Sequence, residues 1–175
     1  MAVDSSQHGR GRASSSRTRT YHHGDLRQAL LDAAQSLLEE RGLEGFTLRE
    51  CARRAGVSHA APAHHFGDAS GLLTAFATAG FRRLSALMQA YRDAAPPGAQ
   101  SQLRAVGRAY IDFAIAHRAQ FQLMFRHDRL SPGDSELGEA GREAAGHLAG
   151  ALSAALAERG VRAEGADFER RLVLA

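Results

Sequence analysis

The 175-residue chain has one cysteine, Cys51, and contains no tryptophan and no lysine. A single cysteine excludes an internal disulfide framework, so disulfide-stapled secreted scaffolds are ruled out and a reducing compartment is expected. No apolar run is long enough to cross a bilayer, and the chain does not open with the segments of a signal peptide. We therefore expect a cytoplasmic protein with no membrane partner.

The sequence also lacks the motifs of common enzymes. It contains no Gly-rich phosphate loop, no Gly-x-Ser-x-Gly elbow and no metal-hydrolase signature. Serine and histidine are present, but no spacing places a nucleophile beside a base. We expect no catalytic residues, no cofactor and no enzymatic activity.

The composition favours helices. Hydrophobic residues make up 44% of the chain, enough to build a core, and proline occurs only four times. Ala, Leu, Arg and Glu dominate, and no strand pattern or internal repeat is visible. The sequence therefore predicts an all-α fold.

The net charge of +3 is concentrated at the N-terminus. Residues 1–23 hold four arginines and one aspartate, whereas the other 152 residues hold 18 arginines and 18 acids. Residues 1–20 have too few apolar side chains to fold, which predicts a disordered basic arm. In one interpretation Arg17 and Arg19 follow DNA phosphates; in the other the arm is a solvated tail with no partner.

Two helices are predicted first. Apolar residues recur every three or four positions over 25–41, which indicates an amphipathic helix closed by Gly42. Thr47, with Glu50 three residues later, has the spacing of a capping box and predicts a second helix over 47–55.

A third short helix follows a glycine turn. Gly56 stops the second helix, and Ser58 is the expected N-cap of a third helix that ends near Phe66. Two short helices joined by a tight glycine turn, with a longer helix before them, are the layout of a helix-turn-helix.

The rest of the chain is predicted to be helical. Ala94 to Gly98 and Arg129 to Asp134 are expected loops, and Gly160 ends a long Ala- and Gly-rich helix. The expected helices cover residues 68–93, 99–117, 118–126 and 135–159, with a last one starting near 167.

One stretch of the sequence resembles a known family. The residues that carry the resemblance are Tyr21-His22-His23-Gly24-Asp25-Leu26-Arg27, Phe46-Thr47-Leu48-Arg49, Ala55-Gly56-Val57-Ser58, His65-Phe66 and Leu72-Leu73. Together they resemble the DNA-binding domain of the tetracycline-repressor (TetR) family over about residues 21–75. The resemblance implies a three-helix DNA-binding domain over 21–67 and a helical ligand-binding and dimerisation domain over 68–175.

The resemblance also implies a set of DNA contacts. Thr47 would bind a phosphate at the start of the second helix, where free amides favour anions. Because the module is slightly acidic, affinity is expected to depend on the N-terminal arm and on Arg49, Arg53 and Arg54. Base edges or phosphates would be met by Ser58, His59, Ala60 and Ala61, and the strand backbone by His64 and His65.

Two departures from the family pattern keep an alternative open. The family usually has Tyr where this chain has Ala63, and Lys where it has Ala69. Residues 24–68 also hold five arginines against seven acids. The alternative is a helical interaction protein with a degenerate DNA-binding head.

Aromatic residues cluster in the fifth and sixth expected helices. At helical spacing such a stripe forms either core alone or core that also walls a pocket for a small apolar or amphipathic effector. The candidate pocket residues are Tyr110, Phe113, His117, Phe121, Met124 and Phe125.

Two further interpretations concern single side chains. His59, His64 and His65 could share a metal ion, which would make the chain a histidine-dependent metal sensor, although no cysteine completes the set. We expect no metal site. Cys51 lies beside an apolar stripe, which favours a small core residue over a redox switch.

The family resemblance implies a function and an assembly. A homodimer would place two recognition helices about 34 Å apart on an inverted-repeat operator. A bound effector would release this repressor from double-stranded DNA. The last expected helix starts as an amphipathic segment near residue 167, and its final four residues, 172–175, are all apolar. We therefore expect a truncated last helix and a weak dimer.

Overall fold

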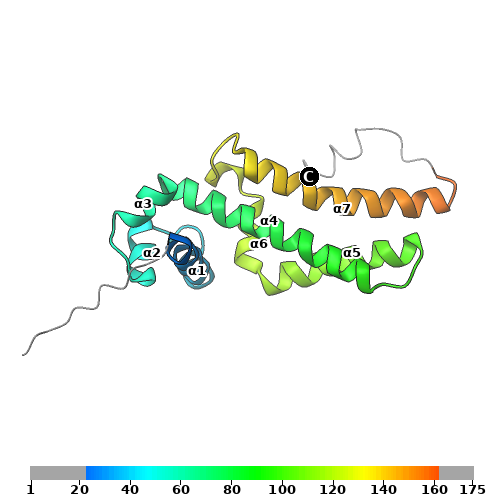
Figure 1. Ribbon diagram of the computed structural model, residues 1–175, viewed down its shortest axis with the longest axis horizontal. Helices are drawn as coiled ribbons and strands as arrows, with labels where there is room; N and C mark the ends of the chain where they lie inside the picture. Colours follow the sequence, from blue (N-terminus) through cyan, green and yellow to red (C-terminus); the bar gives the residue numbers. More distant parts are fainter. Residues whose placement is uncertain (1–22, 162–175) are drawn as a thin grey trace, which may run out of the picture.

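The computed structural model describes residues 23–161, with side chains from residue 26 onward (Figure 1). The basic arm over 1–20 and the helix expected near 167 lie outside these residues. Within the described range the chain is entirely helical, which confirms the all-α prediction. The elements are α1 His23–Arg41, α2 Leu48–Ala55, α3 Ala61–Phe66, α4 Ala69–Ala94, α5 Ala99–Ala116, α6 Arg118–Met124, the 3₁₀ turn η1 His127–Arg129 and α7 Ser135–Glu158.

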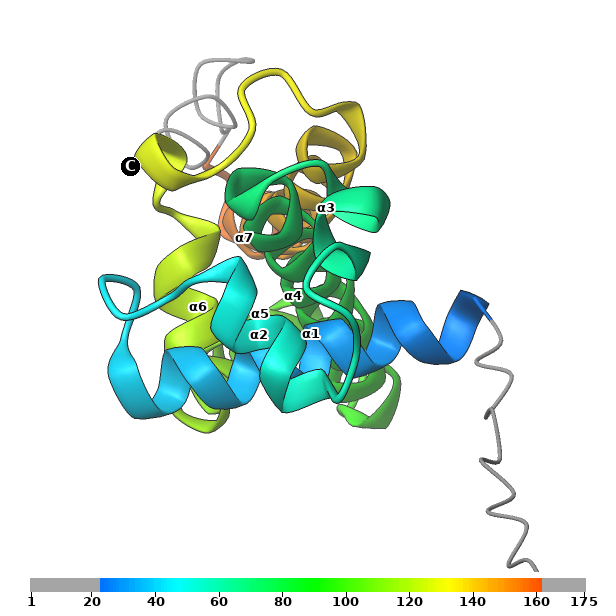
Figure 2. The same ribbon diagram turned by 90° about the vertical axis from the view of Figure 1, so that its left-hand side faces the viewer.

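The molecule is elongated, with a small head at one end (Figure 1). Helices α1, α2 and α3 form the head, and Figure 2 looks onto it with α2 and α3 beside α1. Helix α4 leaves the head and packs against both α5 and α7 in the body. None of the helices in residues 23–161 combines the length and apolar character needed to cross a bilayer.

The core of the head forms between α1, α2 and the start of α4. Leu30, Ala34 and Leu37 of α1 are fully buried, as the apolar spacing predicts. Cys51 is also fully buried, and its thiol donates to the Leu30 carbonyl oxygen at 3.3 Å. Burial raises the pKa of the Cys51 thiol to about 11. The thiol therefore stays protonated at neutral pH, and the interpretation of Cys51 as a core residue is confirmed.

The predicted helix caps form in part. The Thr47 hydroxyl accepts a hydrogen bond from the Glu50 amide at 3.2 Å, which confirms Thr47 as N-cap of α2. The Glu50 carboxylate binds arginine side chains. Gly56 has φ +68°, and its amide bonds back to the last turn of α2, as predicted.

The prediction that Ser58 caps the third helix is wrong. Helix α3 begins at Ala61, after Ala60, and has no side-chain cap. Pro62 gives the reason: in a helix capped by Ser58, residue 62 would have to donate the first backbone hydrogen bond, and proline has no N–H. Instead the Ala61 amide closes a turn onto the Ser58 carbonyl at 3.0 Å, and Pro62 takes the second helical position, where no donor is needed.

The remaining helix ends lie close to the predicted positions. Helix α4 is shifted by one residue, α5 ends at Ala116, and α6 ends at Met124. The sixth helix was expected to include Phe125, which instead lies just beyond it, and the following loop contains η1. Helix ends fray and commonly differ by one or two residues.

Gly56 provides a test of the turn. A Cβ on Gly56 would meet no atom within 4 Å, so the cost of substitution is backbone strain alone. Gly56→Val should lower the free energy of unfolding by more than about 1 kcal/mol, because a β-branched residue is disfavoured at positive φ. Gly56→Asn should cost clearly less, because Asn tolerates this conformation. Urea unfolding of both variants decides it, and equal stabilities would contradict the left-handed turn.

Candidate nucleic-acid interface and ligand cavity

The turn before α3 presents side chains to solvent. Ser58, His59 and Ala60 are exposed, and they lie in the turn before α3. Ala61, the first helical residue, is partly buried, while Pro62 is buried. The sequence-predicted residues 58–61 therefore form one surface, but three of them precede the helix.

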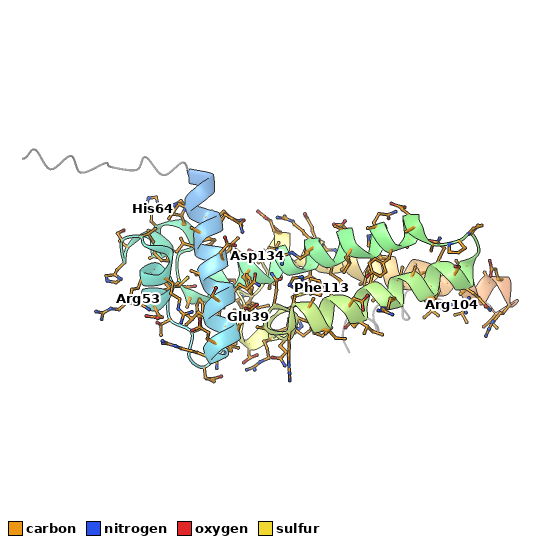
Figure 3. All side chains as sticks on the ribbon, turned by 90° about the horizontal axis from the view of Figure 1, so that it is seen from below. Glu39, Arg53, His64, Arg104, Phe113 and Asp134 are labelled. Carbon is orange, nitrogen blue, oxygen red and sulfur yellow. The ribbon has the colours of Figure 1, made fainter. Side chains whose placement is uncertain are left out.

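The second half of α3 adds two imidazoles to this region. His64 is exposed, and Figure 3 places it at the outer end of the head. His65 is partly buried, with its ring 5.6 Å from that of His64 and 6.3 Å from that of Phe66. No group of three or more histidine, cysteine or acidic residues that could hold a metal occurs in the described part of the chain. His59, His64 and His65 therefore do not form such a group.

The start of α2 carries two further residues that the sequence predicts as DNA contacts. Thr47 and Arg49 are both exposed. The Thr47 oxygen already accepts the Glu50 amide, so its hydroxyl proton is the group left to meet a phosphate. Arg49 has no carboxylate partner among residues 26–161. Arg17 and Arg19 lie outside the described residues.

The other arginines of α2 are paired with acids. Glu50 accepts from the Arg53 Nε at 2.8 Å and from the Arg54 Nε at 3.3 Å. Arg54 also binds Glu40 of α1 at 2.6 Å, and Arg41 approaches Glu50 at 3.5 Å. The hydrogen bond from Arg53 lowers the pKa of Glu50 to about 2. The charges of Arg53 and Arg54 are therefore largely balanced inside the head.

The end of α3 lies in close backbone contact with the first turn of α4. Asp68 caps α4 by accepting the Gly71 amide at 2.9 Å, and this bond lowers the pKa of the Asp68 carboxyl. A Cβ on Gly71 would overlap the carbonyl oxygen of Phe66, the last residue of α3. Gly71 is thus required for the backbone of α3 to approach α4. The orientation of the candidate interface depends directly on the first turn of α4.

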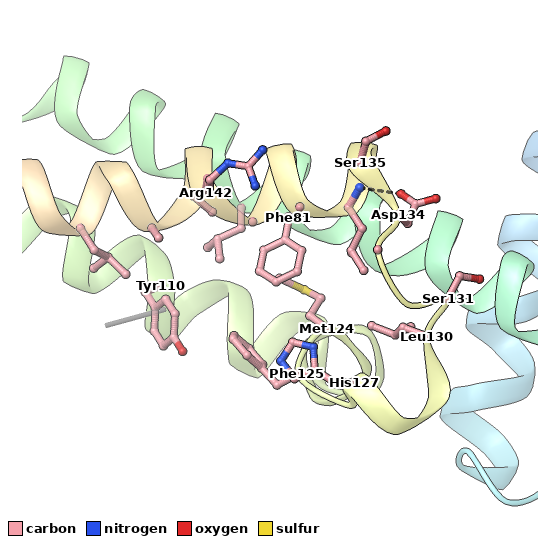
Figure 4. A pocket seen from close by; sticks show the side chains of 18 of the residues that line it. Phe81, Tyr110, Met124, Phe125, His127, Leu130, Ser131, Asp134, Ser135 and Arg142 are labelled. Carbon is pink, nitrogen blue, oxygen red and sulfur yellow. Dashed lines mark hydrogen bonds between the residues drawn. The ribbon is translucent and has the colours of Figure 1, made fainter. Parts of the chain in front are cut away.

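The body contains a cavity of about 1080 Å³ (Figure 4). Tyr110, Met124 and Phe125, three of the predicted pocket residues, line it. The other lining residues are Phe81, Leu84, Gly107, Ile111, His127, Leu130, Ser131, Pro132, Gly133, Asp134, Ser135, Leu137, Gly138, Gly141, Arg142, Ala144, Ala145 and Leu148. The walls therefore come from α4, α5, α6, α7 and the segment between α6 and α7.

Phe113, His117 and Phe121, which were also predicted as pocket residues, do not line this cavity. Phe113 is 1% exposed and packs against the rings of His117 and Phe121. The ring of Phe121 packs edge to face against the ring of Tyr110, with ring centres 5.2 Å apart, and so supports a residue that lines the cavity. His117 lies at the corner between α5 and α6; burial and the charge of Arg83 lower its pKa. At this corner the rings of Phe113 and Phe121 pack in or against the hydrophobic core, and the ring of His117 packs against Phe113.

Sequence reasoning missed most of the wall contributed by α7. Leu137, Gly141, Ala144 and Leu148 recur at helical spacing and all line the cavity. That pattern also fits ordinary packing, so it does not reveal a cavity without the positions of α4 and α5. Opposite α7, the ring of Phe81 on α4 lies 3.9 Å from the position that a Cβ on Gly141 would take.

The segment before α7 links the cavity to the head. Leu130 and Ser131 line the cavity, and the Ser131 amide donates to the Thr74 hydroxyl of α4 at 2.7 Å. The Ser131 hydroxyl lies 3.1 Å from that of Ser70, which in turn bonds to Asp68 at 2.9 Å. Arg129 of η1 also forms an ion pair with Glu44, in the loop between α1 and α2.

Two family models match the chain. Residues 30–76 match the bacterial regulatory proteins of the tetR family, and residues 103–175 match the tetracyclin repressor-like C-terminal domain. The curated relatives include the HTH-type transcriptional regulator BetI of Burkholderia thailandensis and of Burkholderia ambifaria. Each is 40% identical over 89 residues, which is 50% of this chain and 46% of the relative. The chain thus spans about half the length of the curated relatives it matches.

Solved structures share the fold. A protein of unknown function from Rhodococcus sp. RHA1 has 37% identity and a TM-score of 0.72, covering 89% of this chain and 79% of its own. The TetR family transcriptional regulator PfmR from Thermus thermophilus has 22% identity and a TM-score of 0.62, covering 83% and 76%. The second likeness shows the fold alone.

The ion pairs between Glu50 and the arginines of α2 yield a prediction about the affinity of the protein for DNA. Glu50→Gln should raise affinity for random-sequence duplex about fivefold and steepen the salt dependence by about one charge, because Arg53 becomes free to meet a phosphate. Fluorescence anisotropy at several salt concentrations measures both quantities. Glu143→Gln removes the same charge from an exposed position on α7 and serves as control. Equal affinities for the two variants would contradict the role of the Glu50 pairs.

Proposed function

The chain belongs to the tetracycline-repressor (TetR) family of bacterial transcriptional regulators, and on that premise we propose that it is a repressor released from its operator by a small molecule bound in the cavity. The observation that carries the proposal is the segment from Leu130 to Ser135. It lines the cavity and is hydrogen-bonded to the first turns of α4, which follow α3 directly. On this proposal the chain regulates transcription and catalyses no reaction.

The proposed DNA-binding domain is residues 21–67, preceded by the basic arm over 1–20. As a homodimer, the chain would place two copies of α3 about 34 Å apart in successive major grooves of an inverted repeat. Residues 68–175 would bind the effector and form the dimer. The proposed DNA contacts are Arg17, Arg19, Thr47, Arg49, Ser58, His59, Ala60, Ala61, His64 and His65.

The charge distribution assigns different tasks to these groups. Arg53 and Arg54 are held by Glu50 and Glu40, so Arg49 and the arm supply most of the phosphate contacts. The exposed surface before and along α3 carries methyl groups and imidazoles, which suit thymine methyls and base-edge acceptors in the major groove.

One observation favours a second candidate function. Ala63 is exposed at a position where the family usually has a phosphate-binding Tyr, and the neighbouring arginines are neutralised. An interaction protein with a degenerate DNA-binding head would show these features. Selection from a random duplex library separates the two functions: an enriched inverted repeat supports the repressor, and no enrichment at low salt supports the interaction protein.

The arm can be tested by truncation. Deleting residues 1–19 removes four arginines, so affinity for random duplex should fall and the salt slope should flatten by about three to four charges. Anisotropy titrations of the full and shortened chains between low and physiological salt measure this change. An unchanged slope would mean that the arm is a solvated tail.

The link between the cavity and the head gives a further prediction. Thr74→Val keeps the side-chain shape but removes the acceptor of the Ser131 amide, so the segment beside the cavity loses its bond to α4. We expect operator affinity to change at least about fivefold, a shift of roughly 1 kcal/mol.

The matched control for this prediction lies one turn further along α4. Thr78 is buried, and its hydroxyl donates to the Thr74 carbonyl within the same helix at 2.9 Å. Thr78→Val should lower stability without altering operator affinity. Equal effects of the two variants on DNA binding would show that Thr74 contributes stability only.

A further inference from the structure

We propose that the molecule the cavity selects is an anionic amphipath, an acid group on a bulky or extended apolar body, and that Arg142 selects its charge. This inference rests on the proposed function, because it names the ligand class of the same cavity. The inference is based on two observations: the cavity walls are largely apolar, and Arg142 of α7 has no carboxylate partner among residues 26–161.

The walls favour an apolar body. Phe81 and Phe125 pack edge to face with ring centres 5.8 Å apart, and Leu84, Met124 and Leu148 extend the apolar surface. A cavity of about 1080 Å³ lies at the large end of the range for small-molecule sites. Burying such a surface rewards a large apolar ligand in proportion to the area removed from water.

Arg142 is the arginine of the cavity wall, and its side chain is exposed (Figure 4). Its side chain runs back along α7, so that Nη1 lies 3.2 Å from where a Cβ on Gly138 would sit. Gly138 therefore leaves the space that the guanidinium occupies. Among residues 26–161, Arg142 forms no ion pair, whereas the nearby Arg82, Arg108 and Arg126 pair with Glu136, Asp112 and Asp128.

The carboxylate of the cavity wall is already engaged. Asp134 accepts the Leu137 amide at 2.8 Å and caps α7, where the positive end of the helix offsets its charge. Arg142 lies eight residues further on, about 12 Å along the helix axis. The two charges therefore do not neutralise each other, and a ligand anion would find a planar donor suited to bidentate binding.

A cationic ligand would find fewer favourable contacts in this cavity than an anionic one. The rings of Phe81, Phe125 and Tyr110 offer their faces to an ammonium group, but the cavity wall provides no carboxylate free of a capping role. Arg142 would also repel the cation. The charge of the wall thus separates two ligand classes that the apolar surface alone would accept.

The experiment uses the full chain and three probes of matched length: decanoate, 1-decanol and decyltrimethylammonium, each below its micelle concentration. Calorimetric titration should show decanoate binding at least about tenfold more tightly than decanol. Arg142→Gln should abolish that preference and leave decanol binding unchanged. Arg82→Gln, which removes a paired arginine on α4, should keep the preference.

A cavity-filling variant identifies the site. Gly141→Leu should weaken all three probes, because its side chain would meet Phe81 and occupy the space between α4 and α7. Tightest binding of decyltrimethylammonium, an unchanged preference in Arg142→Gln, or no binding of any probe would each overturn the proposal.

An operator-release assay separates this inference from the proposed function. If decanoate binds through Arg142 but leaves DNA bound, the ligand class stands and the effector role fails. If a neutral or cationic probe releases the operator and decanoate does not, the effector role stands and the anionic class is overturned.

Discussion

The backbone contact between Phe66 and Gly71 sets the position of α3 on α4, and with it the relation between the head and the body. A Cβ at residue 71 would overlap the Phe66 carbonyl, so α3 can end against α4 only because this residue is glycine. The Asp68 side chain then caps α4 within the same turn. Because α4 continues into the body and walls the cavity with Phe81 and Leu84, the surface of α3 and the cavity share one rigid element.

The charge pairs of the head reduce its attraction for phosphates. Glu50 binds Arg53 and Arg54, and Glu40 ties Arg54 to α1. Exposed pairs of this kind contribute little stability each, but Arg54 joins two helices through a part-buried side chain. A DNA phosphate would have to compete with these carboxylates, so non-specific affinity depends on cations outside the pairs.

The sequence predicted the structure best where neighbouring residues alone determine the conformation, as at helix ends. Apolar spacing predicted α1 and α4, and Thr47 and Gly56 predicted the ends of α2. The Ser58 cap failed because Pro62 cannot supply the first helical donor, a conflict that is itself readable from the sequence. Three predicted pocket residues lie outside this cavity for another reason: helical spacing cannot tell a ring that lines a cavity, such as Tyr110, from one that packs behind a lining ring, such as Phe121.

The coupling of cavity to head needs a state that the ligand and DNA bind unequally, since a ligand with equal affinity for both states shifts nothing. On the proposed function, the segment from Ser131 to Arg142 would meet that need. Ser131 is bonded to Thr74 of α4, Asp134 caps α7, and Arg142 is a cation of the cavity wall that forms no ion pair among residues 26–161. On the proposed function, a ligand that draws Arg142 inward would act on α7, and the Asp134 cap and the Ser131 bond would carry that displacement to the first turns of α4. The proposed signal would thus reach the head through a dozen residues and two hydrogen bonds, and it would not require the core around Phe113 to rearrange.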